Sequence, residues 1–307
     1  MDFADIIKEL LNEKVQETSS DNLSWTTLCK SLLQEERHDT STLSELSNHL
    51  NECILSLINS KPNKNSRFIK GILERPFYLA FVEMLKNCFE NNGEFPQSVK
   101  TSQVHMLENV NLARMKEIEE EMKRIINSWN GFPLFLIIKD YNTFLGLRTT
   151  LGSATQSPPS LIECINSFTL RHVKSNAKSN RSNISNTLTV GAKAFSKHCH
   201  RDISRSFWGI CSGTEKQKNE QANQILAKII ANAAWVNLHS LPHDTRVFEV
   251  RTSDGYGARW EIWEPKQMQS YDDSKENNDD DSNEPKIIFR GFLEPQMVDG
   301  HSKGWIH

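Results

Sequence analysis

The sequence predicts a mainly α-helical protein with a small antiparallel β-sheet near the C-terminus, an α+β fold in which an irregular helical bundle precedes a β-meander. In the first 130 residues, apolar side chains recur at the i, i+3 and i+4 spacing of amphipathic helices. Strand-like alternation is confined to the C-terminal part, in Val247–Arg251 and Ala258–Trp263. Runs of helices followed by a run of strands are typical of the α+β class.

Residues 1–130 are expected to form the helical portion. Five helices are predicted from apolar stripes and from residues that favour helix ends, such as Ser24, Thr42 and Pro76 at starts and Asn91–Gly93 at an end. The fifth of these helices is expected from about Ser102 to Trp129. No fixed repeat of 20 to 50 residues is present, which favours an irregular bundle over a repeat array.

Residues 131–307 are expected to form the α+β portion, which either shares one core with the helical portion or forms a second domain. Its clearest helix signal begins at Thr214–Gln217, which has the form of a capping box. A stripe of apolar residues from Ala222 to Ala233 follows, and we expect this helix to continue through Trp235–His239 and to stop at Pro242. The hairpin around Asp254–Gly257 comes next, with a third strand at Ile287–Leu293.

Two polar inserts, at 174–187 and 271–284, are expected to form flexible loops. In the first, eight of fourteen residues are Ser or Asn, and the second holds seven carboxylates against one lysine. Segments of this composition contain too few apolar groups to fold by burial.

Charge and cysteine usage limit the function classes. A net charge of −3 gives no overall attraction to polyanions, so affinity for nucleic acid would need a local patch. The six cysteines are scattered without a C-x-x-C pair, and neither a secretory segment nor a membrane-spanning run is expected. These features favour a cytoplasmic or nuclear protein with reduced thiols and no bound cofactor.

Histidines are concentrated in the C-terminal half, and His239, His243 and His301 are the candidate catalytic acids and bases. A metal site is less favoured. Pro242 lies between His239 and His243, so that pair cannot take the helical spacing of a zinc-binding motif, and no second ligand pair completes a site. The alternative for all these histidines is local hydrogen bonding, and no bound metal is expected.

A basic segment at residues 171–205 is the candidate nucleic-acid surface. It holds eight Lys or Arg residues and one acid, and Lys193, Lys197, Arg201 and Arg205 carry the prediction. Phosphate backbones favour such patches because neutralising each charge releases counterions. Phe207 and Trp208 follow directly and would offer rings for stacking if they were exposed. The alternative is ordinary solvated charge.

The predicted sheet supplies the candidate ligand-binding residues Arg251, Arg259, Arg290 and Trp260. Arginines on neighbouring strands can grip a phosphate or carboxylate through paired hydrogen bonds. The alternative is that Arg259 pairs with Glu261, which lies two residues further along the same strand face.

No motif identifies an activity, so two function classes remain open. The favoured interpretation is an intracellular non-catalytic binding or scaffold protein with a protein partner, and nucleic acid is the further candidate partner at the basic segment. The alternative is an enzyme that acts on a phosphate- or carboxylate-bearing substrate at an Arg/His site in the C-terminal half. Convergence of these arginines and histidines in one place would favour the enzyme.

Overall fold

The computed structural model describes the greater part of the chain, in segments separated by gaps. The described residues are 2–16, 23–36, 45–59, 73–96, 99, 104, 107, 112–128, 138, 140–149, 157–172, 187–201, 207–263 and 286–296.

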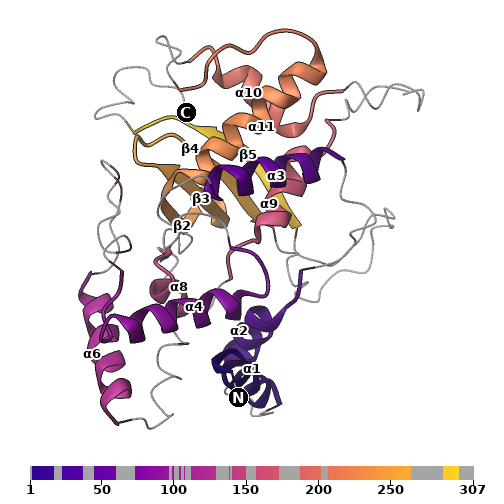
Figure 1. The fold of residues 1–307 in the computed structure, drawn as a ribbon. Helices are drawn as coiled ribbons and strands as arrows, with labels where there is room; N and C mark the ends of the chain where they lie inside the picture. Colours follow the sequence, from indigo (N-terminus) through magenta and orange to yellow (C-terminus); the bar gives the residue numbers. More distant parts are fainter. Residues whose placement is uncertain are drawn as a thin grey trace.

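The fold is α+β, as predicted (Figure 1). The N-terminal part supplies the helices α1 (Phe3–Gln16), α2 (Leu23–Leu33), α3 (Glu45–Asn59), α4 (Phe77–Glu90) and α6 (Leu112–Ser128). The remaining helices are α8 (Tyr141–Phe144), α9 (Leu161–Thr169), α10 (Val190–His198) and α11 (Glu215–Ala231). The predicted fifth helix is shorter than expected, because it begins at Leu112 and the described positions 104 and 107 are not helical.

The sheet follows the chain in simple order. Strands β2 (Ala233–Leu241), β3 (Thr245–Thr252), β4 (Gly257–Trp263) and β5 (Lys286–Leu293) pair successively and antiparallel, which confirms the predicted meander. A two-residue strand, β1 (Arg148–Thr149), lies parallel to β2 at the opposite edge from β5. The β3–β4 turn includes Gly255, whose φ of 88° suits glycine.

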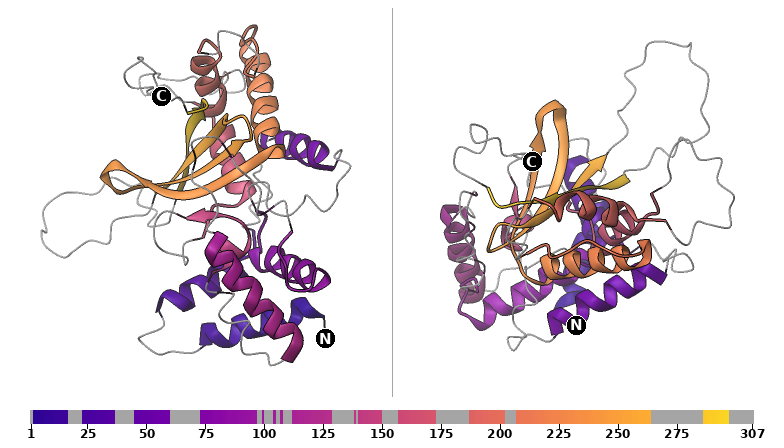
Figure 2. Two further views of the ribbon diagram at one scale, coloured as in Figure 1. Left: turned by 90° about the vertical axis from the view of Figure 1, so that its left-hand side faces the viewer. Right: turned by 90° about the horizontal axis from the view of Figure 1, so that it is seen from above.

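Helices cover one face of the sheet (Figure 2). Helices α9 and α10 pack against β5, α11 packs against β3 and β4, and α3 packs on α9 and α11. The N-terminal helix α3 therefore lies directly on the C-terminal part. Buried side chains of both portions, from Ile7 to Phe292, belong to one hydrophobic cluster.

Local sequence explains where the helices of this layer begin. Thr214 caps α11 with the expected capping box, in which its side chain accepts from the Gln217 amide. Helix α9 begins with a second capping box formed by Ser160 and Glu163. On α11, Leu226 and Ile229 are fully buried, in agreement with the predicted apolar stripe.

One sequence prediction is wrong at the end of α11. The helix ends at Ala231, capped by Asn232, and Trp235–His239 belongs to β2 rather than to the helix. The physical reason is the periodicity of two in this segment: Val236 and Leu238 face the helices, while Asn237 and His239 point to the other side. Pairing with β3 supplies the backbone hydrogen bonds that the helix would have made.

The two polar inserts at 174–187 and 271–284 lie outside the described residues, except for Thr187. Their expected flexibility stays a prediction, as does the division at residue 130.

Truncating the centre of the buried α11 face should destabilise the protein strongly. Leu226 is fully buried, so Leu226→Ala should lower the free energy of unfolding by about 2–5 kcal/mol, through lost apolar transfer and the cavity that remains. Urea unfolding followed by circular dichroism measures this. Leu79→Ala on α4, where the side chain is 46% exposed, is the matched control and should cost less than about 0.5 kcal/mol. Equal losses at the two positions would contradict the assignment of Leu226 to the core.

Candidate active site

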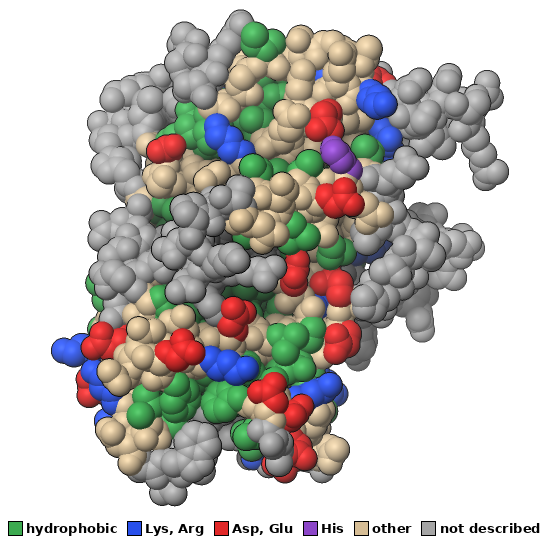
Figure 3. All heavy atoms as spheres, viewed as in Figure 1, with side chains coloured by type: hydrophobic (Ala, Val, Ile, Leu, Met, Phe, Trp, Pro, Cys, Tyr) green, Lys and Arg blue, Asp and Glu red, His purple; other side chains and the backbone are tan. Residues whose placement is uncertain are grey.

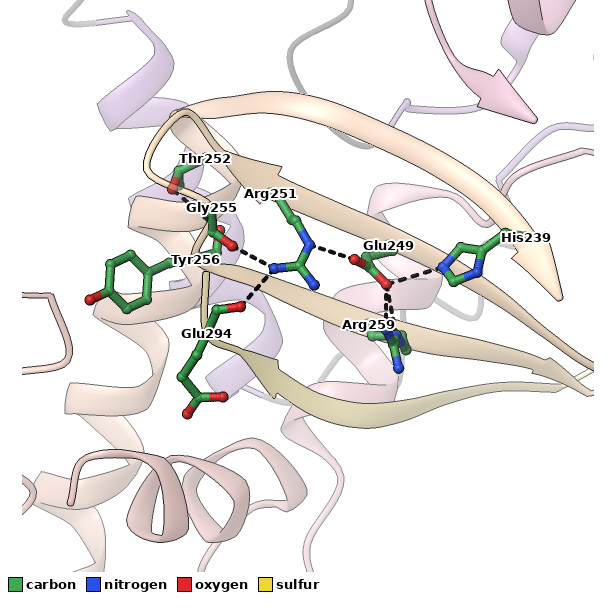
Figure 4. Close-up of polar contacts among 8 residues, drawn as sticks. All are labelled: His239, Glu249, Arg251, Thr252, Gly255, Tyr256, Arg259 and Glu294. Carbon is green, nitrogen blue, oxygen red and sulfur yellow. Dashed lines mark hydrogen bonds and ion pairs between the residues drawn. The ribbon is translucent and has the colours of Figure 1, made fainter. Parts of the chain in front are cut away.

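A cluster of four charged or titratable side chains lies on the sheet face opposite α9 and α11 (Figure 4). It consists of His239 on β2, Glu249 and Arg251 on β3, and Arg259 on β4, and is called the sheet cluster below. Strand register brings these residues together, because Glu249 pairs directly with Arg259 on one side and with Asn237 on the other. The sheet cluster therefore depends on two separate hairpins.

Glu249 is the centre of the sheet cluster. Its Oε1 accepts from Arg251 Nε at 2.5 Å. Its Oε2 accepts from Arg259 Nε at 2.8 Å and Nη2 at 2.7 Å, and contacts His239 Nε2 at 3.1 Å. Both carboxylate oxygens are thus occupied, and the side chain is buried.

Electrostatics keep Glu249 ionised. Burial by itself raises the pKa of this carboxyl, but the hydrogen bond from His239 and the charges of Arg251 and Arg259 outweigh it and lower the pKa to about 2. An ionised carboxylate only accepts hydrogen bonds, so His239 Nε2 carries the proton that points to Glu249. This hydrogen bond orients the imidazole ring, so that its other nitrogen, Nδ1, points away from Glu249.

Arg251 connects the sheet cluster to the ends of the neighbouring strands. Its Nη1 donates to the carbonyl oxygen of Gly255 at 2.6 Å and to that of Glu294 at 2.8 Å. The side chain is almost fully buried. A Cβ on Gly255 would lie 3.0 Å from Pro295, so a glycine allows the turn to approach the chain after β5. Arg251 therefore holds the β3–β4 turn against the segment that follows β5.

Glu294 extends this network to the helical layer. Its Oε1 contacts His198 Nδ1 at 2.7 Å, and its Oε2 lies 3.6 Å from Arg201 Nη1. His198 and Glu294 are both buried. The last residue of α10 is thus joined through Glu294 and Arg251 to the sheet cluster.

Within the sheet cluster, His239 and Arg259 are the members that reach the surface. Their side chains are 18% and 24% exposed, whereas those of Glu249 and Arg251 are 3% and 4% exposed. A guanidinium has five N–H donors, so Arg259 can hold Glu249 and still donate to an incoming oxyanion. A proton-transfer group beside an anion-binding group is what chemistry at a phosphate requires.

The other arginine and the tryptophan predicted for this site lie elsewhere. Trp260 is fully buried on the helix-facing side of β4, where its Nε1 donates to the Cys164 carbonyl oxygen at 3.2 Å. Arg290 pairs with Glu261 at 3.1 Å. The alternative pairing of Arg259 with Glu261 is not what the structure has, because the cross-strand neighbour Glu249 holds Arg259 instead.

Of the candidate catalytic histidines that the structure describes, His239 is in the sheet cluster and His243 is not. His243 is exposed in the 3₁₀ turn Pro242–Asp244 that joins β2 to β3, with a φ of 66°. His301 lies outside the described residues. No group of three or more His, Cys, Asp or Glu side chains that would suit a metal ion occurs in the described segments.

The basic segment is only partly described. Lys193 contacts His172, Arg201 pairs with Glu294, and Lys197 is exposed, while Arg205 lies outside the described residues. Phe207 and Trp208 are buried against Tyr256 and Phe292, so neither ring is free for stacking by a ligand. On the face drawn in Figure 3, basic and acidic side chains are interspersed. Nucleic-acid binding by the basic segment stays a prediction.

Sequence reasoning missed Glu249, although a signal for it exists. A carboxylate between Phe248 and Val250 is unusual in a buried strand and needs a partner. Counting outward from the Asp254–Gly257 turn places Arg259 directly opposite it. Applying hairpin register to the charged residues would have predicted this ion pair.

A family model described as the CdiA C-terminal tRNase toxin domain matches residues 177–264, which is less than a third of the chain. The matched range includes α10, α11 and β2–β4, and therefore all four residues of the sheet cluster. No curated protein and no solved structure matches the chain.

This match corrects the favoured interpretation of the sequence. The interpretation as a non-catalytic binding or scaffold protein is wrong, because the matched domain is described by an enzymatic activity on tRNA. The alternative, an enzyme for a phosphate-bearing substrate, agrees better with the match.

Protein and nucleic-acid partners are both compatible with the match. Among the described helices, none is both long and apolar enough for a membrane span. The expected cytoplasmic or nuclear location stays a prediction.

Proposed function

We propose that the protein cleaves RNA of the tRNA class, and that the sheet cluster is its active site. The observation that carries this proposal is that the family match and the sheet cluster fall in the same part of the chain. The part of the chain that matches a tRNase toxin domain is the part whose strand register assembles His239, Glu249, Arg251 and Arg259.

The proposed reaction is an internal transfer at a phosphodiester of RNA. A base removes the proton of the ribose 2′-hydroxyl, the 2′-oxygen bonds to phosphorus, and the bond from phosphorus to the 5′-oxygen breaks. A proton is returned to that leaving oxygen. The products are a 2′,3′-cyclic phosphate and a 5′-hydroxyl, so atoms and charge balance without an added reactant. Such a step needs proton transfer and stabilisation of the charge on phosphorus.

His239 is the proton-transfer group in this proposal. The carboxylate of Glu249 fixes the Nε2–H of the ring, at 3.1 Å, and so presents Nδ1 as the atom that accepts or donates a proton. The same logic of a carboxylate that orients an imidazole operates in catalytic triads. Partial exposure of His239 allows contact with a substrate.

Arg259 is the phosphate-binding group. It lies on the strand next to Glu249, and its Nε and Nη2 are held by that carboxylate, which fixes the plane of the guanidinium. A fixed guanidinium loses little side-chain entropy when it binds a phosphate oxygen. Its charge favours the additional negative charge that develops on the phosphorus-bound oxygens during the reaction.

Glu249 and Arg251 are positioning residues, since both are buried and neither reaches a substrate. Glu249 holds His239 and Arg259 on one carboxylate, and Arg251 fixes Glu249 from the opposite side. This arrangement keeps the acid/base and the anion-binding group at a constant separation, which is the requirement for preorganised catalysis.

Incubation of the purified full chain with total tRNA is the direct test. We expect fragments on a denaturing gel that end in 2′,3′-cyclic phosphates, and no cleavage when the RNA is replaced by DNA of the same sequence, which lacks the attacking hydroxyl. An RNA carrying one 2′-deoxy substitution at the mapped cleavage site is the matched control and should resist cleavage there only. Intact tRNA after prolonged incubation, or equal cleavage of the deoxy-substituted site, would rule out the proposed reaction.

A further inference from the structure

A second group of exposed side chains lies on the same sheet face as the sheet cluster, toward the β5 edge. It consists of Trp263 on β4 and of Lys286, Ile288 and Arg290 on β5, and is called the β4–β5 patch below. Trp263 and Ile288 are 38% and 41% exposed, although both are large and apolar. Lys286 and Arg290 are also exposed.

Strand register places the β4–β5 patch beside the sheet cluster. On β4, Arg259, Glu261 and Trp263 occupy alternate positions and so share one face. On β5, Lys286 pairs with Trp263 and Ile288 pairs with Glu261. Arg259 and Trp263 are four residues apart on one strand, a separation of about 13 Å at the usual rise per residue.

The patch has the chemistry of a single-strand binding surface. Lys286 Nζ lies 5.9 Å from the centre of the Trp263 ring, so a cation accompanies the exposed aromatic group. Arg290 pairs with the carboxylate of Glu261 at 3.1 Å and so balances the charge of that acid, which leaves Lys286 as the net positive charge of these described residues. Exposed rings flanked by cations hold single strands, since bases stack on the ring while the cations contact phosphates.

We propose that the β4–β5 patch binds a single-stranded segment of RNA next to the bond that is cleaved. One base stacks on Trp263, and Lys286 contacts a phosphate beside it. This inference rests on the proposed function, because it takes the sheet cluster as the place of cleavage. The β4–β5 patch is thus a subsite that extends the RNA contact from Arg259 along β4 toward the sheet edge. Because it stacks on a base, this subsite selects unpaired RNA over a duplex, whose bases are already stacked on one another.

Binding measured without cleavage tests this inference. The probe is a fluorescently labelled single-stranded oligonucleotide with 2′-O-methyl groups throughout, which has no free 2′-hydroxyl to react. Trp263→Ala should weaken its binding by at least about fivefold, the lower end of what stacking one base contributes. Lys286→Gln should lower the slope of log affinity against log salt concentration by about one. A duplex of the same sequence should bind more weakly than the single strand.

Two matched variants separate this patch from other surfaces. Leu170→Ala removes an apolar side chain directly after α9 that is 60% exposed, more than the 38% of Trp263, and Lys8→Gln removes an exposed charge on α1. Both should leave binding unchanged. Wild-type affinity in Trp263→Ala, or a loss of salt dependence in Lys8→Gln but not in Lys286→Gln, would overturn the inference. Cleavage of tRNA together with Trp263-independent binding would refute only the patch. Trp263-dependent binding without any cleavage would refute only the proposed reaction.

Discussion

Replacing His239 with alanine should lower the rate of tRNA cleavage by about 10²–10⁴-fold, the usual contribution of a general acid or base. The expected loss follows from the position of His239, whose Nε2–H is held by Glu249 while the ring stays partly exposed. Initial rates on a labelled tRNA at saturating concentration measure the effect. The fall should be in kcat, because His239 acts on the reacting atoms rather than on the bound RNA.

The matched control is His243→Asn. His243 is an exposed histidine in the turn that follows β2, and asparagine tolerates its positive φ. We expect this variant to cleave at the wild-type rate. If His243→Asn loses activity and His239→Ala keeps it, the turn rather than the sheet cluster is the catalytic centre. Circular dichroism of both variants checks that the fold is retained.

The second large effect is expected at Glu249. Glu249→Gln should lower the free energy of unfolding by about 3–5 kcal/mol, because it leaves the buried charge of Arg251 without its partner. Denaturant unfolding measures this loss. Glu261→Gln on the neighbouring strand removes a carboxylate that pairs with the exposed Arg290, and it should cost less than about 1 kcal/mol.

Adding Arg251→Met to Glu249→Gln should restore part of the lost stability, since an apolar side chain removes the unpaired charge. No recovery would mean that the loss comes from packing around Glu249 rather than from charge.

Low pH should weaken the ion pairs of Glu249 and so lower the stability of the protein. The pKa of Glu249 is lowered from 4.5 to about 2 in the folded protein, so its contribution is fully present above about pH 4.5 and is lost as the pH falls through 2. Stability measured across this interval should decline less steeply in Glu249→Gln than in the wild type. Parallel pH profiles would contradict a low pKa in the native state.

The sequence alone determined the main architecture. Local sequence signals are sufficient for elements that are specified by residues close together in the chain. Examples are the Thr214 capping box, the apolar stripe of α11 and the glycine-containing turn of the β3–β4 hairpin. These signals act between residues three or four positions apart or across one tight turn, so they can be followed along the chain. The α+β class and a third strand at Ile287–Leu293 were predicted on that basis, and the observed strand is Lys286–Leu293.

Only the tertiary structure decided where α11 ends and where His239 lies. Apolar residues continue from α11 into β2, and a short apolar run fits a helix or a strand equally well by periodicity. Pairing with β3 makes Trp235–His239 a strand. This pairing turns His239 toward Glu249, a partner that helical spacing would never have suggested.

The candidate site likewise combines predicted and unpredicted parts. Arg251, Arg259 and His239 could be selected from the sequence as residue types suited to phosphate chemistry, but so could Arg290 and Trp260, which lie outside the sheet cluster. Residue type states what a side chain can bind. Strand register determines which side chains share a face and meet across strands, and register depends on pairing between segments that the sequence leaves separate.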